Sequence, residues 1–232
     1  MSSQILTESI IADMVKLGVV FGHKKSKTHP RMKPFITGNK NEIELIDPEV
    51  TFAGLQKAAV FLKEKVMANG LILIVGTIPS AKSVTEEFAK EFKSPFVVSR
   101  WLGGTLTNFA IINKRSQYYQ DLKIRKDSGG LNKYTKKEQL QFNNEIRKMA
   151  KFFDGLLNLN RLPDALLVVD IKAHETAVRE AKRMHIPVVA ILDTDDNIDL
   201  VAYPILANDH AKSSIEWVMN QIKQIIKSTN DQ

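Results

Sequence analysis

The sequence predicts an α/β fold, in which a doubly wound parallel sheet of about five strands carries an inserted α-helical, coiled-coil-like hairpin. Two observations predict it. Continuously apolar segments such as LILIVG (71–76) and ALLVVD (165–170) alternate with segments of helical periodicity, and strands buried on both faces of a parallel sheet have this composition. The alternation is interrupted between about residues 105 and 160, where two helical patterns follow each other without a strand between them.

The N-terminal region is predicted to hold a helix, a basic loop and a β-hairpin. Thr7 suits the N-cap of a helix over about 8–17, and Gly18 suits its end. The stretch 22–40 contains two prolines and lacks helical periodicity, so we expect a loop that leads into short strands. The β-hairpin would have strands at 35–37 and 43–46 and a turn at 38–41.

Helices and strands alternate through the rest of the predicted sheet domain. Helices are expected at 48–67, 80–92, 174–184 and 209–227, and strands at 71–76, 96–99, 165–170 and 187–192, with a short extra strand at 201–205. Pro48 suits the first turn of its helix and Ser80 suits an N-cap. This alternation is typical of a flavodoxin-like, doubly wound sheet with helices on both faces.

The interruption is predicted to be a helical hairpin. Its halves, 107–127 and 135–157, repeat their inward-facing residues at steps of three and four, which is the spacing of a coiled-coil seam. The seam residues would be Phe109, Ile112, Ser116 and Tyr119 in the first half and Ile146, Met149, Phe153 and Leu156 in the second. Two helices of about 20 residues would project about 30 Å. We therefore divide the chain into an α/β domain at 1–104 and 161–232 and an inserted hairpin at 105–160.

The basic charge is concentrated in two segments. The chain has a formal net charge of +7. Residues 22–40 hold six basic residues and no acidic ones, and residues 110–151 hold eleven basic and four acidic residues. Together these segments carry +13, and the remaining 171 residues carry −6. Cations without acidic neighbours suit contacts with the phosphates of irregular RNA, so the pattern favours a polyanionic partner over an ordinary solvated surface.

Composition excludes several classes of protein. The chain has no cysteine, which excludes a disulfide scaffold, a thiol nucleophile and cysteine-based zinc or iron–sulfur sites. The first twenty residues lack the features of a secretory signal and contain acidic residues, which transit peptides avoid. No apolar stretch approaches the roughly 20 residues that span a bilayer. We expect a soluble, cytoplasmic protein without a membrane partner.

The alternative to RNA binding is a small-molecule-binding enzyme or regulator. Its site would combine the turn Gly76–Ala81 with the acidic run Asp193–Asp196, because ligands of doubly wound sheets bind beyond the carboxyl ends of the strands. The turn has one glycine and matches neither phosphate-binding motif, so an ordinary loop is favoured. The run 193–199 could hold Mg²⁺, but Asp170 is its only obvious partner, so a solvated turn is favoured.

No catalytic or metal-binding motif is present. The sequence lacks a nucleophile elbow, an HExxH motif and paired histidines, so we expect no catalytic residue and no cofactor. His23 and His29 lie among six cations, which oppose metal binding, and no metal site is expected. Arg100 and Trp101 precede two glycines. Arg100 suits a phosphate contact, whereas Trp101 could stack on a base or plug the base of the hairpin.

Several blocks of the chain resemble the bacterial-type small-subunit ribosomal protein S-two family. They are GVVFGHKKSKTHPRMKPFITGNKNEIELID (18–47), LIVGT (73–77), RWLGGTLTNF (100–109), LPDALLVVD (162–170), IPVVAILDT (186–194) and NDHAKSSI (208–215). The resemblance implies a structural protein that binds 16S rRNA near the head–body junction of the small ribosomal subunit. Its implied partners are other small-subunit proteins, including the mRNA-binding protein S-one. It implies no catalysis, no cofactor, no small-molecule substrate and no obligate homo-oligomer.

The resemblance and the charge pattern together give the candidate RNA-binding residues. They are His23, Lys24, Lys25, Lys27, Arg31, Lys33, Lys40, Arg100, Trp101, Lys114, Arg115, Lys123, Arg125, Lys126, Lys133, Lys136 and Lys137. The hairpin residues in this set are assigned by position and charge and not by a motif. Gly22, Pro34, Gly103 and Gly104 are expected to be structural. A helical-hairpin adaptor that binds no RNA is a third hypothesis.

Overall fold

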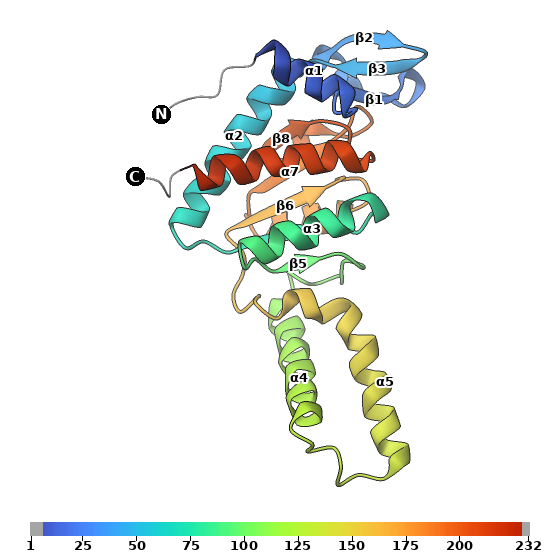
Figure 1. The fold of residues 1–232 in the computed structure, drawn as a ribbon, viewed down its shortest axis with the longest axis vertical. Helices are drawn as coiled ribbons and strands as arrows, with labels where there is room; N and C mark the ends of the chain where they lie inside the picture. The colour runs from blue at the N-terminus through green and yellow to red at the C-terminus, as the bar shows by residue number, and fades with distance from the viewer. Residues whose placement is uncertain (1–6, 229–232) are drawn as a thin grey trace.

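A computed structural model describes residues 7–228. Figure 1 shows a sheet covered by helices, a small second sheet at one end of the long axis and a helical hairpin projecting from the other end. None of the described helices is long and apolar enough to cross a membrane.

The central sheet is parallel and has five strands. They are β4 (Ile72–Val75), β5 (Phe96–Val97), β6 (Ala165–Val169), β7 (Val188–Leu192) and β8 (Tyr203–Leu206). Their spatial order is β5-β4-β6-β7-β8, with every neighbouring pair parallel. Counted along the chain this is the 2-1-3-4-5 order of flavodoxin-like sheets, which confirms the predicted fold class. The predicted extra strand at 201–205 is a full member of the sheet.

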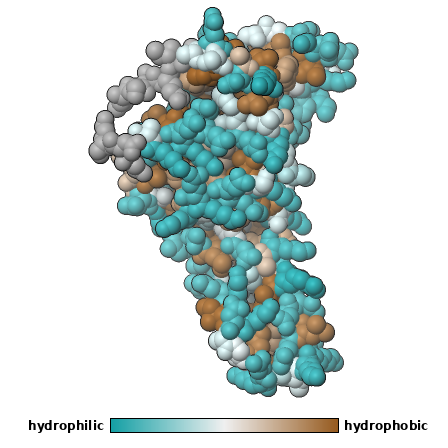
Figure 2. Space-filling view, in the orientation of Figure 1, coloured by the Kyte–Doolittle hydropathy of each residue, from teal (hydrophilic) through white to brown (hydrophobic). Residues whose placement is uncertain are grey.

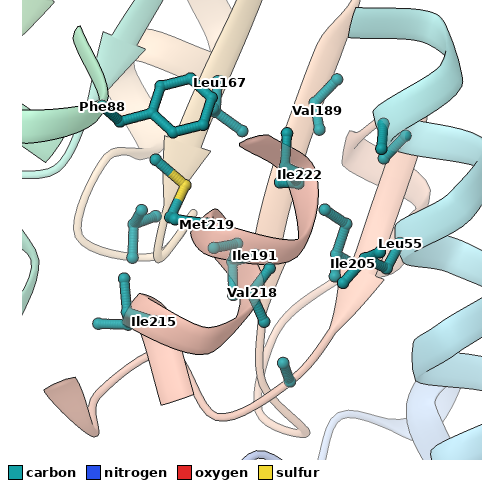
Figure 3. Packing of buried hydrophobic residues seen from close by; sticks show 14 of the residues in the cluster. Leu55, Phe88, Leu167, Val189, Ile191, Ile205, Ile215, Val218, Met219 and Ile222 are labelled. Atoms are coloured by element: carbon teal, nitrogen blue, oxygen red, sulfur yellow. The ribbon is translucent and has the colours of Figure 1, made fainter. Parts of the chain in front are cut away.

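Helices cover both faces of this sheet. They are α2 (Pro48–Met67), α3 (Pro79–Glu91), α6 (Glu175–Arg183) and α7 (Lys212–Lys227). Alternate strand residues face opposite sides, so Ile74 joins a core with α2, α3 and α7, whereas Val75 joins a core with α6 and the hairpin base. Figure 3 shows the first core, where Met219 and Ile222 of α7 pack over Leu167 and Val189. Every residue of β4, β6 and β7 is buried, as their apolar composition predicts.

The N-terminal region forms a second sheet. After α1 (Glu8–Lys16) come β1 (Phe21–Lys24), two 3₁₀ helices, η1 (Lys25–Lys27) and η2 (Pro30–Phe35), then β2 (Ile36–Lys40) and β3 (Ile43–Ile46). The three strands pair antiparallel in the order β1-β3-β2. The prediction of a loop over 22–40 was therefore wrong, since this stretch contains β1, two 3₁₀ helices and β2. Strand β1 was not recognised because its four residues show no alternation of buried and exposed positions. The expected turn at 38–41 was also misplaced: it lies at Asn41 and Glu42, which both have positive φ.

The hairpin consists of α4 (Phe109–Asp127) and α5 (Lys136–Phe153), followed by the 3₁₀ helix η3 (Asp154–Leu156). Of the predicted seam, Ile112, Ser116 and Tyr119 are buried on α4, and Ile146, Phe153 and Leu156 are buried on the returning side. The hydroxyl of Tyr119 donates to Asp154 Oδ1 at 2.5 Å. A capping box between Thr135 and Glu138 begins α5. The domain boundaries at 105 and 160 stay a prediction.

Two predicted helix starts differ from the structure. Helix α3 begins at Pro79 with Ile78 as its N-cap, so Ser80 is not the cap. Proline is favoured at the first helical position because it lacks the N–H that would have no partner there. Helix α7 begins at Lys212 rather than near Asp209, because the side chain of Asn208 accepts hydrogen bonds from the backbone N–H groups of His210 and Ala211 and forms a separate turn.

Candidate nucleic-acid interface

The N-terminal basic block, residues 22–40, lies at the end of the molecule opposite the hairpin (Figure 1). The side chains of its six lysines and arginines are exposed: Lys24, Lys25, Lys27, Arg31, Lys33 and Lys40. Two of them have carboxylate partners, since Lys24 lies 3.5 Å from Glu42 and Arg31 lies 3.0 Å from Asp199. Among residues 7–228, the other four lysines form no ion pair within 4.0 Å, so their charges are available to a polyanion.

This block is fixed to the body of the molecule through the loop after β7. The backbone N–H of His23 donates to Thr194 Oγ1 at 2.8 Å, and that of His29 donates to Thr194 O at 2.9 Å. A Cβ atom at Gly22 would lie 2.5 Å from Thr194 Cγ2, which explains the glycine. Met32 is buried beneath η2, and Pro34 lies within η2 with its ring exposed. The basic block is thus attached to the body and is not a free loop.

His23 points toward an acidic cluster in the body. Its Nδ1 lies 2.9 Å from Asp193 Oδ2 and 3.4 Å from Asp195 Oδ1, and its side chain is 21% exposed. The hydrogen bond with Asp193 raises the pKa of the His23 imidazole above its usual value, against the opposing effect of burial. This contact ties the side chain to the body, so in our proposal below His23 positions the basic block.

The acidic cluster lies where β6, β7 and β8 end. Its buried carboxylates belong to Asp170, Asp193, Asp196 and Asp209. Burial raises the pKa of Asp196 to about 8 and that of Asp209 to about 6. The sequence indicated only Asp170 as a partner for the 193–199 run. Asp209 was missed because it lies after the fifth strand, whose end position depends on the sheet order.

Histidine and lysine side chains surround this cluster. His210 Nδ1 lies 2.5 Å from Asp209 Oδ1, and this hydrogen bond raises the pKa of His210 to about 9. Lys172 lies 2.6 Å from Asp195. His23, Asp193 and His210 offer ligand atoms within 4.8 Å of one another, and so do Asp170, Asp209 and His210. Imidazole and carboxylate atoms are ligands that zinc accepts, but Nδ1 of His210 is hydrogen-bonded to Asp209 instead; the expected lack of a metal stays a prediction.

The segment 100–107 connects β5 to the hairpin. Arg100 is exposed, whereas Trp101 is 9% exposed and its indole N–H donates to Glu180 Oε1 at 3.0 Å. This burial supports the plugging role of Trp101 over base stacking. Gly104 has a φ of +89°, a conformation that favours glycine. A Cβ atom at Gly103 would meet nothing within 4 Å, so nothing in the structure requires that glycine.

Glu180 of α6 contacts this segment, and its role was not predicted from the sequence. It is 8% exposed. Besides the Trp101 indole, its Oε1 accepts the Gly104 N–H at 2.8 Å, and its Oε2 accepts the N–H groups of Leu106 at 2.9 Å and Thr107 at 3.1 Å and the Thr107 hydroxyl at 3.2 Å. Glu180 lies on the same face of α6 as Ala177 and Ala181, which are both buried. A charged residue on an apolar helix face is the sequence signal that could have predicted its role.

The hairpin presents most of its predicted cations to solvent. Exposed side chains belong to Lys114, Arg115, Arg125, Lys126, Lys133, Lys136 and Lys137. Lys123 differs, because it lies 3.3 Å from Asp154 and over the ring of Tyr119. Arg147 and Lys148 are also exposed on α5 and extend the basic surface beyond the predicted set. Figure 2 shows isolated hydrophobic residues among the hydrophilic ones along the hairpin.

The turn of the alternative site packs against other side chains of the protein. A Cβ atom at Gly76 would overlap Thr85 Oγ1, so this glycine permits close packing rather than phosphate binding. The N–H of Thr77 donates to His174 Nε2 at 3.1 Å and is not free to bind an anion. Two surface cavities, of about 310 and about 400 Å³, are lined by other residues. The turn 76–81 therefore has the geometry of an ordinary loop.

Comparison with known proteins agrees with these features. The family model described as ribosomal protein S2 matches residues 14–229. A small ribosomal subunit protein uS2 from Rhodopirellula baltica is 39% identical over 221 residues, which are 95% of this chain and 85% of the relative. Those from Dictyoglomus thermophilum and Roseiflexus sp. are 38% and 41% identical; the matches cover 96% and 90% of this chain and 90% and 80% of the relatives.

These matches confirm the resemblance found in the sequence. They cover the central sheet, both basic segments and the hairpin together. Because the family is structural and not catalytic, they also confirm that the chain is not an enzyme, and the small-molecule alternative is set aside. The chain belongs to the ribosomal protein S2 family.

Proposed function

We propose that this chain is a structural constituent of the cytoplasmic small ribosomal subunit and binds 16S rRNA there. The observation that carries the proposal is a pair of exposed basic surfaces, one on the N-terminal block and one on the hairpin. They lie at opposite ends of the folded molecule, and the chain belongs to this family. Lysine and arginine side chains neutralise backbone phosphates, and irregular RNA is recognised largely through its shape and backbone.

Within this proposal the cations contribute unequally. Lys25, Lys27, Lys33 and Lys40 contact phosphates directly, because no carboxylate within residues 7–228 pairs with them. Lys24 and Arg31 must first give up a surface carboxylate partner. Arg100 and the exposed hairpin cations form the second contact. His23 and Trp101 hold these surfaces in place through Asp193 and Glu180.

The position in the subunit is also part of the proposal. We propose that the chain lies near the head–body junction and is a docking platform for S-one beside other small-subunit proteins, as the resemblance implies. The net charge of −6 outside the two basic segments supports this, since it leaves the body free for protein partners while the basic ends face RNA. We further propose that the chain is not an obligate homo-oligomer.

The test is binding to 16S rRNA as a function of salt. Wild-type affinity should fall steeply, with about −0.9 or somewhat less in the log–log slope for each neutralised phosphate. The variant Lys25→Glu/Lys27→Glu/Lys33→Glu should lose affinity. Its matched control, Lys57→Glu/Lys82→Glu/Lys90→Glu, makes the same charge change at three exposed positions on the body and should bind nearly as wild type.

Two results would contradict the proposal: affinity that is insensitive to salt, or equal losses in the two triple variants. Co-sedimentation with small subunits and crosslinking to 16S rRNA then locate the contact. Subunits assembled with and without the chain, incubated with S-one, test the docking role. Loss of S-one only from subunits that lack the chain is the expected outcome.

A further inference from the structure

The hairpin is joined to the body at two points. It enters through residues 101–107, which converge on the carboxylate of Glu180. It leaves through η3, where Gly155 packs so closely on the backbone oxygen of Phe96 in β5 that a Cβ atom would overlap it. The Tyr119–Asp154 hydrogen bond ties α4 to η3 near this base. The direction of the hairpin therefore depends on the two attachments together.

The entry attachment rests on one buried charge. Burial raises the pKa of the Glu180 carboxyl, but the hydrogen bonds from Trp101, Leu106 and other donors of the segment outweigh it, so this pKa lies below its usual value. Within residues 7–228 no lysine, arginine or histidine forms an ion pair with Glu180. Its negative charge is stabilised by the N–H and O–H groups of one segment, and hydrogen bonds to a charged group are stronger than those between neutral groups.

Convergence of these donors defines the path of the chain. Both oxygens of Glu180 are used, one by Trp101 and Gly104 and the other by Leu106 and Thr107. The segment can satisfy both oxygens only if it turns at Gly104, whose φ is +89°. The same turn buries Thr105 and Leu106 completely or nearly so, directly before α4 begins.

We propose that Glu180 is a positioning residue for RNA binding: it holds the hairpin at the angle at which the hairpin and the N-terminal basic block contact 16S rRNA simultaneously. This inference rests on the proposed function. Two contact surfaces on one rigid body act as linked sites, because the first contact raises the effective concentration of the second. If the hairpin base is loosened, ordering it again opposes binding.

The test variant is Glu180→Gln, which keeps the shape of the side chain. An amide has one acceptor oxygen, and its NH₂ group would face the donors that now bind the second oxygen. Glu180→Asp keeps the charge and serves as the conservative variant. The matched control is Thr51→Val, which removes the buried hydrogen bond from Thr51 Oγ1 to Leu206 O (2.6 Å) beside β8, at the sheet edge opposite β5.

Hairpin orientation is measured directly in the folded protein. The chain has no cysteine, so Lys57→Cys on α2 and Asn132→Cys near the hairpin tip, both exposed positions, accept spin labels without background. The distribution of label–label distances should broaden in Glu180→Gln and stay narrow in Thr51→Val. Thermal melting of each variant shows that the measurement is made below its unfolding transition.

RNA binding gives the second measurement. Glu180→Gln should bind 16S rRNA about tenfold or more weakly, since linking two sites commonly strengthens binding by that factor or more. Its log–log salt slope should be shallower by about 0.9 for each phosphate that the variant no longer neutralises. Glu180→Asp should recover part of both, and Thr51→Val should change neither. Two results for Glu180→Gln would overturn the positioning role. One is a label–label distance distribution as narrow as that of wild type; the other is a broadened distribution with wild-type affinity and salt slope. If wild type itself fails to bind 16S rRNA, the proposed function falls as well, which is a different outcome.

Discussion

The Nδ1 atom of His23 lies 2.9 Å from Oδ2 of Asp193, although 170 positions separate the two residues in the chain. His23 belongs to the N-terminal basic block, and Asp193 follows the fourth parallel strand of the central sheet. Together with the hydrogen bonds of His23 and His29 to Thr194, this contact makes the small sheet and the large sheet one body.

Replacing His23 by alanine should destabilise the fold. Asp193 is 1% exposed, and loss of a partner from a buried charged group costs about 1–3 kcal/mol. Urea unfolding gives the change in the free energy of unfolding. Lys24→Ala removes a neighbouring exposed side chain and should change it by less than about 0.5 kcal/mol. Equal effects of the two substitutions would contradict the role of the His23–Asp193 contact.

Gly22→Ala should destabilise the protein, whereas Gly103→Ala should not. The added Cβ at Gly22 would lie 2.5 Å from Thr194 Cγ2 and 2.7 Å from Thr194 Oγ1, whereas at Gly103 it would meet nothing within 4 Å. Overpacking of this kind costs about 1–3 kcal/mol. Thermal melting of both variants measures the difference. A melting temperature of Gly22→Ala equal to that of Gly103→Ala would show that the loop carrying Thr194 moves freely.

The contribution of His174 to stability should decrease as the pH falls below about 6.5, the ordinary pKa of histidine, while the raised pKa values of Asp196 and Asp209 act in the opposite direction. The His174 side chain is 2% exposed and its Nε2 accepts the Thr77 N–H, which requires the neutral ring. Burial lowers the pKa of His174, so the unfolded chain binds the proton more readily, and the stability present above pH 6.5 is lost below it. His174→Gln should remove this contribution, so the melting temperature of the variant relative to that of wild type should rise as the pH falls below 6.5. An identical slope in the variant would contradict this cause.

The outer part of the hairpin should be dispensable for folding of the body. Residues 124–148 lie beyond Tyr119 and Asp154, whose hydrogen bond closes the hairpin base. Replacing them with a short Gly/Ser linker should leave a single cooperative unfolding transition by calorimetry and weaken binding to 16S rRNA. Loss of cooperative unfolding would mean that the division into a sheet domain and an inserted hairpin at 105–160 is wrong.

Much of the fold could be predicted because its signals are local. Buried parallel strands are continuous apolar runs, and the hairpin seam repeats at steps of three and four. Strand β1 was missed because its four residues show no alternation, and its pairing with β3 depends on residues twenty positions away. Ser80 was chosen as a cap from its side chain alone, whereas Pro79 decides where α3 begins.

The positions of the basic residues in the candidate interface could be predicted from the sequence, but the contacts that hold the interface in place could not. Exposed lysines in 22–40 and on the hairpin follow from composition. That His23 turns inward, or that Glu180 collects the donors of 101–107, depends on which strand ends and helices adjoin, and the sequence does not contain that as a local pattern. A histidine inside a basic run therefore looked like an RNA ligand, although its ring contacts a carboxylate.

The strand order has a consequence for folding during synthesis of the chain. β4 pairs with β6, which follows it by about ninety positions, so the centre of the sheet cannot close until the whole hairpin has been translated. The anchor for the N-terminal block is Thr194, later still in the chain. The sheet β1-β3-β2 pairs within residues 21–46, so the basic block can take its own shape early, but it gains its attachment to the body only after Thr194 has been synthesised.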